Sequence, residues 1–165
     1  MHRDHLEFNL CYSILLEDMH QTLMGRIDRL CTFAQLALGC AVVSALWPGV
    51  VTGALVAVLA SFQLVYQPAG RAMEAKIQKE RYQALRCVSA GLADDALRDA
   101  LDSAALQDSA IPGLLTHAAW LAAAIQLDRV IPAEQMKLGW LEAWMAAVAG
   151  NRPRFVAKLD VEERG

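Results

Sequence analysis

The sequence lacks acidic and basic side chains over 41 consecutive residues, because no Asp, Glu, Lys, Arg or His occurs in 30–70. Charged residues make up 20% of the 165-residue chain, so a soluble segment of this length would be interrupted several times. About 18 apolar residues are enough for a helix to cross a bilayer. The absence therefore argues against a soluble segment and predicts a membrane-embedded one.

Sequence motifs for catalysis or metal binding are also missing. The four cysteines form no C-x-x-C pair, and there is no Gly-rich phosphate loop, G-x-S-x-G or H-E-x-x-H. The net charge of −3 gives no support for nucleic-acid binding. We therefore expect no enzyme activity, catalytic residue, cofactor, metal site or nucleic-acid partner. His117 is expected to be a core histidine and His20 a solvated one.

The uncharged run is divided near its middle by Trp47, Pro48 and Gly49, which are residues typical of a turn. We expect apolar helices at about 30–47 and 50–66, each covering roughly 25–27 Å. The sequence thus predicts an all-α protein with a membrane hairpin of two transmembrane helices. The alternative is a hairpin buried in a soluble bundle, which the rest of this chain is too short to cover.

Basic residues on both sides of the run set its expected orientation. They are Arg26 and Arg29 before the first apolar helix, and Arg71, Lys76, Lys79 and Arg81 after the second. The turn between the helices carries no charge. Because Lys and Arg are enriched in cytoplasmic flanks, both termini are expected in the cytoplasm.

Four polar residues within the apolar helices are candidates for lining a pore or for joining the helices: Gln35, Ser44, Thr52 and Gln63. Gln35 lies 13 residues before Pro48 and Gln63 lies 14 after Gly49, so we expect them at one level of the hairpin. Bracing the hairpin is favoured over lining a pore, because two glutamines per subunit are few for a pore. Small residues suited to close helix contact are Gly39, Ala41, Ala45, Gly53, Ala57 and Ala60.

The chain is expected to divide into five parts. Residues 1–29 form an amphipathic helix, 30–67 the membrane hairpin, and 68–130 a cytoplasmic bundle with helices at about 69–90, 94–107 and 111–129. Residues 131–150 hold a last amphipathic helix, about 133–149, and 151–165 form a flexible tail. The segment 111–129 is favoured as a buried helix over a third span. Trp140 and Trp144 line the last helix, which either lies on the membrane or, as favoured here, packs on the bundle.

The exit from the hairpin reads Tyr66-Gln67-Pro68-Ala69-Gly70-Arg71-Ala72, and a charged helix with Arg81-Tyr82-Gln83-Ala84-Leu85 follows it. With the preceding layout, this resembles the SLATT family of two-span bacterial membrane proteins and similar prophage proteins, over about residues 5–130. The resemblance implies an inner-membrane effector that forms homo-oligomers and perturbs the bilayer. It also implies a cytoplasmic trigger or partner protein that senses or synthesises a nucleotide.

The leading expectation is therefore an oligomeric, pore-forming effector of bacterial conflict or phage origin, with the lipid bilayer as its main partner. A phage holin is a close variant. A non-toxic membrane anchor or scaffold that recruits a cytoplasmic partner is a second class, and a soluble helical interaction protein is a third.

Overall fold

The computed structural model of the chain describes residues 3–43, 48–108, 110–129, 131 and 136–150. The elements are α1 (Arg3–Val43), α2 (Gly49–Tyr66), α3 (Pro68–Ser89), α4 (Asp94–Ala105), η1 (Gly113–Leu115), α5 (Thr116–Gln126) and α6 (Trp140–Val148), where η1 is a 3-10 helix. These described residues contain no β-strand. The expected all-α class is confirmed.

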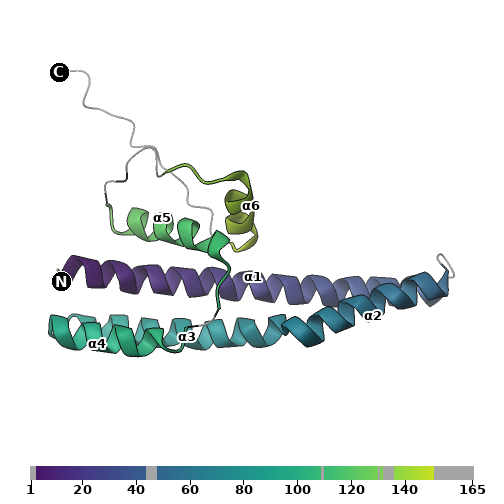
Figure 1. Cartoon of the computed structure of the whole chain (residues 1–165), viewed down its shortest axis with the longest axis horizontal. Coiled ribbons are helices and arrows are strands. Elements are labelled where there is room, and N and C mark those ends of the chain that lie inside the picture. Colours follow the sequence, from purple (N-terminus) through teal and green to yellow (C-terminus); the bar gives the residue numbers. More distant parts are fainter. Residues whose placement is uncertain (1–2, 44–47, 109, 130, 132–135, 151–165) are drawn as a thin grey trace, which may run out of the picture.

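The longest element is α1, which continues without a break for 41 residues, or about 60 Å. α2 and α3 return along it one after the other, so the three helices form one long antiparallel hairpin (Figure 1). α3 to α6 gather around the N-terminal part of α1 and form the bundle. Residues 30–43 of α1 project from the bundle together with α2 (Figure 1), and we call this pair the stalk.

A single residue, Gln67, separates α2 from α3. Its backbone has a φ of 45°, in the left-handed region. Its N–H donates to the carbonyl of Gln63 at 2.9 Å and closes α2, while its carbonyl accepts from the N–H of Arg71 at 3.0 Å. Pro68 then takes the first position of α3, where a missing N–H removes no helical hydrogen bond. The helices therefore break at Gln67-Pro68, at the boundary expected between the hairpin and the helices that follow it.

Three buried clusters hold the bundle together, and each includes residues of α1. The cluster with α3 and α4 contains Leu6, Leu10, Ile14, Tyr82, Leu97 and Leu101. The cluster with η1, α5 and the end of α6 contains Met19, Leu23, Leu115, Ala118, Ala119, Ala146 and Ala149. The third contains Phe8, Cys11, Leu121, Ala123, Ala124 and Ile131. α1 is therefore the central helix, covered on two sides.

The prediction of a solvated His20 is wrong, because α1 is covered on two sides. The side chain of His20 is fully buried, and so is that of Glu17 one turn before it. Burial lowers the pKa of His20, Arg71 lowers it further, and Glu74 acts in the opposite direction. His117 is half-buried, and its Nδ1 lies 3.2 Å from Oε2 of Glu142.

The last two helices are shorter than predicted. α5 has 11 residues, too few to cross a bilayer, and several of them are buried, which confirms a buried helix over a third span. α6 begins at Trp140 rather than near 133. The N–H of Gly139 donates to Oε2 of Glu142 at 2.9 Å and caps the helix there. This hydrogen bond makes the largest contribution to lowering the pKa of Glu142. Residues 132–135 lie outside the described part.

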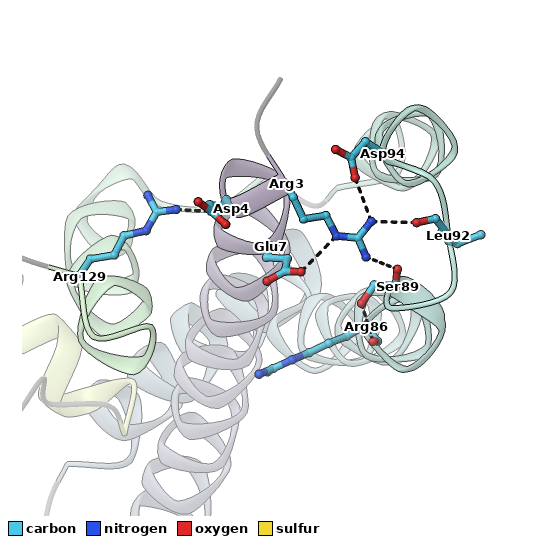
Figure 2. A network of polar contacts seen from close by, with 8 residues as sticks. All are labelled: Arg3, Asp4, Glu7, Arg86, Ser89, Leu92, Asp94 and Arg129. Carbon is cyan, nitrogen blue, oxygen red and sulfur yellow. Dashed lines mark hydrogen bonds and ion pairs between the residues drawn. The ribbon is translucent and has the colours of Figure 1, made fainter.

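Two arginines fasten the bundle to the N-terminal end of α1 (Figure 2). Arg3 donates to the carbonyl oxygens of Ser89 and Leu92, the latter at 2.8 Å, and pairs with Asp94 at 3.0 Å and Glu7 at 3.2 Å. On the other side, Arg129 donates to the carbonyl of Asp4 at 2.6 Å. Its guanidinium also lies 4.4 Å from the ring centroid of Phe8. Both flanks of α1 are thus held at the end farthest from the stalk.

Candidate membrane-spanning hairpin

Where its side chains are described, the stalk exposes apolar side chains on both α1 and α2, away from the seam where the two helices meet. In α1, Leu30, Phe33 and Leu36 are each 68% exposed. In α2 the exposed large side chains are Val50, Val51, Leu55, Val58, Phe62, Leu64, Val65 and Tyr66. Monomeric soluble proteins rarely expose a continuous apolar surface of this extent. The stalk is therefore the candidate functional site.

Within the described residues, one helical stretch is long and apolar enough to cross a membrane, judged by length and composition. It begins at Gly49, and only 6% of its most apolar 18-residue window is buried. This window coincides with α2, which is about 27 Å long. The apolar part of α1 is described only for residues 30–43, and 44–47 lie outside the described part. Of the predicted pair of spans, the second has the length it needs.

The turn residues are described only in part. Trp47 and Ser44 lie outside the described residues. Pro48 precedes α2, and its carbonyl accepts hydrogen bonds from the N–H of Val51 at 3.0 Å and of Thr52 at 3.3 Å. The hydroxyl of Thr52 donates to the same carbonyl at 3.3 Å, and its side chain is fully buried. Thr52 therefore satisfies its hydrogen bond inside its own first turn.

The structure places Gln63 about one turn away from its predicted level. Its Nε2 donates to Oγ1 of Thr32 at 3.3 Å and to Oδ1 of Asp28 at 3.4 Å. Thr32 lies three residues before Gln35, the expected neighbour. The prediction assumed that the two helices turn symmetrically about Pro48 and Gly49, whereas the hydrogen bonds of Gln63 set the register of α2 against Asp28 and Thr32. Gln35 is half-buried on the same helix as Thr32.

Asp28 and Thr32 were missed in the sequence as partners of Gln63. Asp28 is the last acidic residue before the uncharged run, and Thr32 lies four residues later, on the same face of α1. The hydroxyl of Thr32 donates to the carbonyl of Asp28 at 3.0 Å. This pair was the available signal, because two polar residues on one face at the edge of an apolar run require a polar partner.

Three of the predicted basic residues lie at the base of the stalk. Arg26 donates from Nη1 to the carbonyl of Val148 at 2.7 Å, at the end of α6. Arg29 is exposed one turn further along α1. Arg71 lies with its guanidinium carbon 5.7 Å from the ring centroid of Tyr66, which is itself stacked on Phe62 at 4.8 Å. Positive charge and aromatic rings therefore meet at one level of the molecule.

The other three basic residues lie further along α3. Lys79 donates to Oδ1 of Asp18 at 2.9 Å and to Oε1 of Gln21 at 3.2 Å, both across the interface with α1. Arg81 donates to the side-chain oxygens of Gln78 and Gln107, and Lys76 pairs with Glu80 at 3.9 Å. Lys79 and Arg81 thus hold helices together, whereas the sequence grouped them only as basic residues that flank the apolar run.

A polar network around the buried side chains of Gln78 and Tyr82 links α3 to the residues after α4. The hydroxyl of Tyr82 donates to Oδ1 of Asp108 at 2.7 Å, and Nε2 of Gln78 donates to the same oxygen at 2.8 Å. Gln78 also donates to the carbonyl of Ala104 at 2.7 Å. Burial and the neighbouring Asp108 raise the pKa of Tyr82. This network fixes α4 in place and does not reach the stalk.

No group of three or more His, Cys, Asp or Glu side chains able to hold a metal occurs in the part of the chain that the structure describes. Comparison with known proteins gives no relative: no family model, curated protein or solved structure matches this chain.

Proposed function

We propose that the protein is an integral protein of the bacterial inner membrane, with the stalk crossing the bilayer as a hairpin and the bundle in the cytoplasm. The observation that carries this is the exposed apolar surface of the stalk, concentrated at one end of the molecule. Helices bond their own backbone groups internally, which is a requirement for crossing lipid. The exposed Arg29 and Arg71 at the base of the stalk favour a cytoplasmic bundle and cytoplasmic termini.

Within that membrane, the protein acts as an oligomeric effector that perturbs the bilayer, as the resemblance to SLATT proteins implies. Two small residues of the stalk support self-association. A Cβ added at Gly39 or Gly53 would meet no atom within 4 Å, so neither glycine serves the packing of α1 on α2. Small residues on the outer surface of a transmembrane helix allow another helix to approach closely. A second copy of the stalk is the partner that this surface fits.

Membrane potential measured with a fluorescent dye tests the proposal in bacteria that express the chain. Val58 lies near the centre of α2 and is exposed, so Val58→Asp adds about 2.5–3.5 kcal/mol to the cost of insertion. The matched control is Leu106→Asp, which changes an exposed leucine of the bundle. The wild type and the control should depolarise the cells and stay in the membrane after alkaline washing, whereas Val58→Asp should do neither. Wild-type protein in the wash supernatant would refute the membrane assignment.

Self-association has its own test. Gly39→Leu combined with Gly53→Leu adds bulk where the single chain has room for it. Chemical crosslinking in membranes should then yield fewer oligomers, with the protein still inserted and the depolarisation reduced. The control is Val65→Leu, which enlarges an exposed side chain elsewhere on α2. Unchanged oligomers in the double variant would place the contact on another surface.

A non-toxic anchor or scaffold is the second candidate, and the hydrogen bonds of Gln63 favour it. Its amide is engaged inside the hairpin with Asp28 and Thr32, as expected for a brace rather than for the lining of a pore. An unchanged membrane potential, with the protein confirmed in the membrane and no trigger able to alter it, would support the scaffold. The bundle would then be the surface that recruits a cytoplasmic partner.

A further inference from the structure

Two tryptophans on α6 are exposed although they lie close to the base of the stalk. Trp140 is 83% exposed and Trp144 59%. Leu141 is exposed beside them. Tryptophan side chains are largely buried on average. We therefore expect the exposed tryptophans of this nine-residue helix to contact a partner.

The opposite face of α6 is the one that packs on the bundle. Its buried residues are Ala146 and, just after the helix, Ala149, in the cluster with Met19 and Leu23 of α1. At 100° per residue, Trp140 and Trp144 lie on the far side of the helix from Ala146 and Ala149. Met19 and Leu23 lie before Arg26, on the side away from the stalk. The tryptophan face is therefore turned away from the bundle core.

The position of α6 along α1 is fixed by contacts at its C-terminal end. Arg26 donates to the carbonyls of Ala147 at 3.3 Å and Val148 at 2.7 Å. Gly150, with a φ of 82°, approaches so closely that an added Cβ would lie 3.3 Å from Thr22 and 3.4 Å from Arg26. α6 lies crosswise to α1, on the stalk side of α5 (Figure 1). Its axis is thus held across the direction of the stalk.

The level of this contact coincides with the edge of the uncharged run. Arg26 precedes Leu30 by four residues, which is about 6 Å of helix rise. Side chains extend roughly 5–6 Å from a helix axis. The rings on the outward face of α6 therefore reach the level at which the apolar stalk begins. Arg29 and Arg71 supply exposed positive charge at the same level.

We propose that α6 lies on the cytoplasmic surface of the bilayer, with Trp140 and Trp144 inserted among the lipid headgroups. Indole rings combine an apolar body with a polar N–H and are enriched at this interface. Short amphipathic helices bind there with their apolar face turned to the lipid. One helix thereby packs on the bundle through its alanines and on lipid through its tryptophans. The inference rests on the proposed insertion of the stalk.

Tryptophan fluorescence in lipid vesicles tests this placement. The variant Trp47→Phe/Trp120→Phe keeps only Trp140 and Trp144, because the chain has four tryptophans. A quencher attached near the lipid headgroup should reduce their fluorescence by roughly twofold, and one at the bilayer centre far less. The control Trp47→Phe/Trp140→Phe/Trp144→Phe keeps only Trp120, whose ring lies edge-on to Phe8 inside the bundle. It should respond to neither quencher.

The outcomes separate this inference from the proposed function. If neither quencher affects Trp140 and Trp144 while the protein stays with the vesicles after alkaline washing, the placement of α6 is wrong and the membrane hairpin stands. If the unsubstituted chain is itself washed from the vesicles, the hairpin fails and the placement of α6 fails with it. Stronger quenching from the bilayer centre would also overturn a headgroup position.

Discussion

The side-chain amide of Gln63 in α2 lies 3.4 Å from the carboxylate of Asp28 in α1, at the base of the stalk. The contact joins residues 35 positions apart and ties the end of the second apolar helix to the last acidic residue before the first. Because Gln63 also bonds Thr32, the two helices are locked in one register at this level.

The contact between Gln63 and Asp28 should contribute measurably to the stability of the hairpin. We expect Gln63→Leu to lower the free energy of unfolding in detergent by about 0.5–1.5 kcal/mol. A double-mutant cycle with Asp28→Asn should reveal coupling between the two positions. Gln35→Leu is the control, because the hydrogen bonds of Gln63 go to Asp28 and Thr32. Equal effects of the two leucine variants would contradict this register.

Removing the hydroxyl of Tyr82 should destabilise the bundle. Tyr82→Phe removes the hydrogen bond from the buried side chain of Tyr82 to the carboxylate of Asp108, and we expect a loss of about 1–2 kcal/mol in thermal or chemical unfolding. Tyr66→Phe is the matched control, because the ring of Tyr66 is exposed at the base of the stalk. A Tyr82→Phe variant as stable as the wild type would mean that the hydrogen bond to Asp108 contributes little.

Arg3 should protect the connection between α3 and α4 from local opening. Its guanidinium reaches two carbonyls and two carboxylates at once, a geometry that the single ammonium of lysine does not reproduce (Figure 2). We expect Arg3→Lys to speed hydrogen exchange at Gly91 and Leu92 roughly fivefold, equivalent to about 1 kcal/mol. Arg98→Lys is the control, because Arg98 pairs with Asp102 on the exposed side of α4. Unchanged exchange in Arg3→Lys would exclude this role.

The stability of the bundle should depend on pH through His20. Burial and Arg71 lower its pKa in the folded chain below the ordinary 6.5, so the unfolded chain binds the proton first. Stability should therefore fall as the pH falls from about 6.5 toward the lowered pKa, by at most about 1.4 kcal/mol per pH unit. Melting curves in detergent at about pH 7.5 and 5.5 measure this. The dependence should shrink in His20→Gln, and an unchanged slope would assign it to other groups.

The helical content, the uncharged stalk and the break at Gln67 were accessible from the sequence. They depend on local signals: absence of charge, turn residues and proline. The position of Gln63 relative to α1 could not be predicted from the sequence, because the register of two helices follows from where each one ends. Counting residues outward from Pro48 misplaces Gln63 by about one helical turn. Its partners Asp28 and Thr32 come from a segment that the sequence assigned only to the helix entering the hairpin.

The burial of α1 on two sides was also inaccessible to pattern analysis. A stripe such as Phe8, Met19 and Leu23 indicates one packed face, and this face contacts α5 and α6. The second face, with Leu6, Leu10 and Ile14, is set by the arrival of α3 and α4 from later in the chain. His20 was therefore placed in solvent. The start of α6 was missed for a different reason: Gly139 and Glu142 form a local cap that interrupts an otherwise continuous apolar pattern.

The outgoing and returning helices of the long hairpin differ mechanically. α1 contains no proline and runs unbroken from the bundle to the end of its described part. The returning half consists of two helices, α2 and α3, with a break between them at Gln67. Helices bend sharply only at features such as proline or bulges, so α1 behaves as a lever arm. A tilt of about 10° around its midpoint displaces each end by roughly 5 Å. A change in the angle of the apolar end is thereby converted into movement of Arg3 and the helices that it holds.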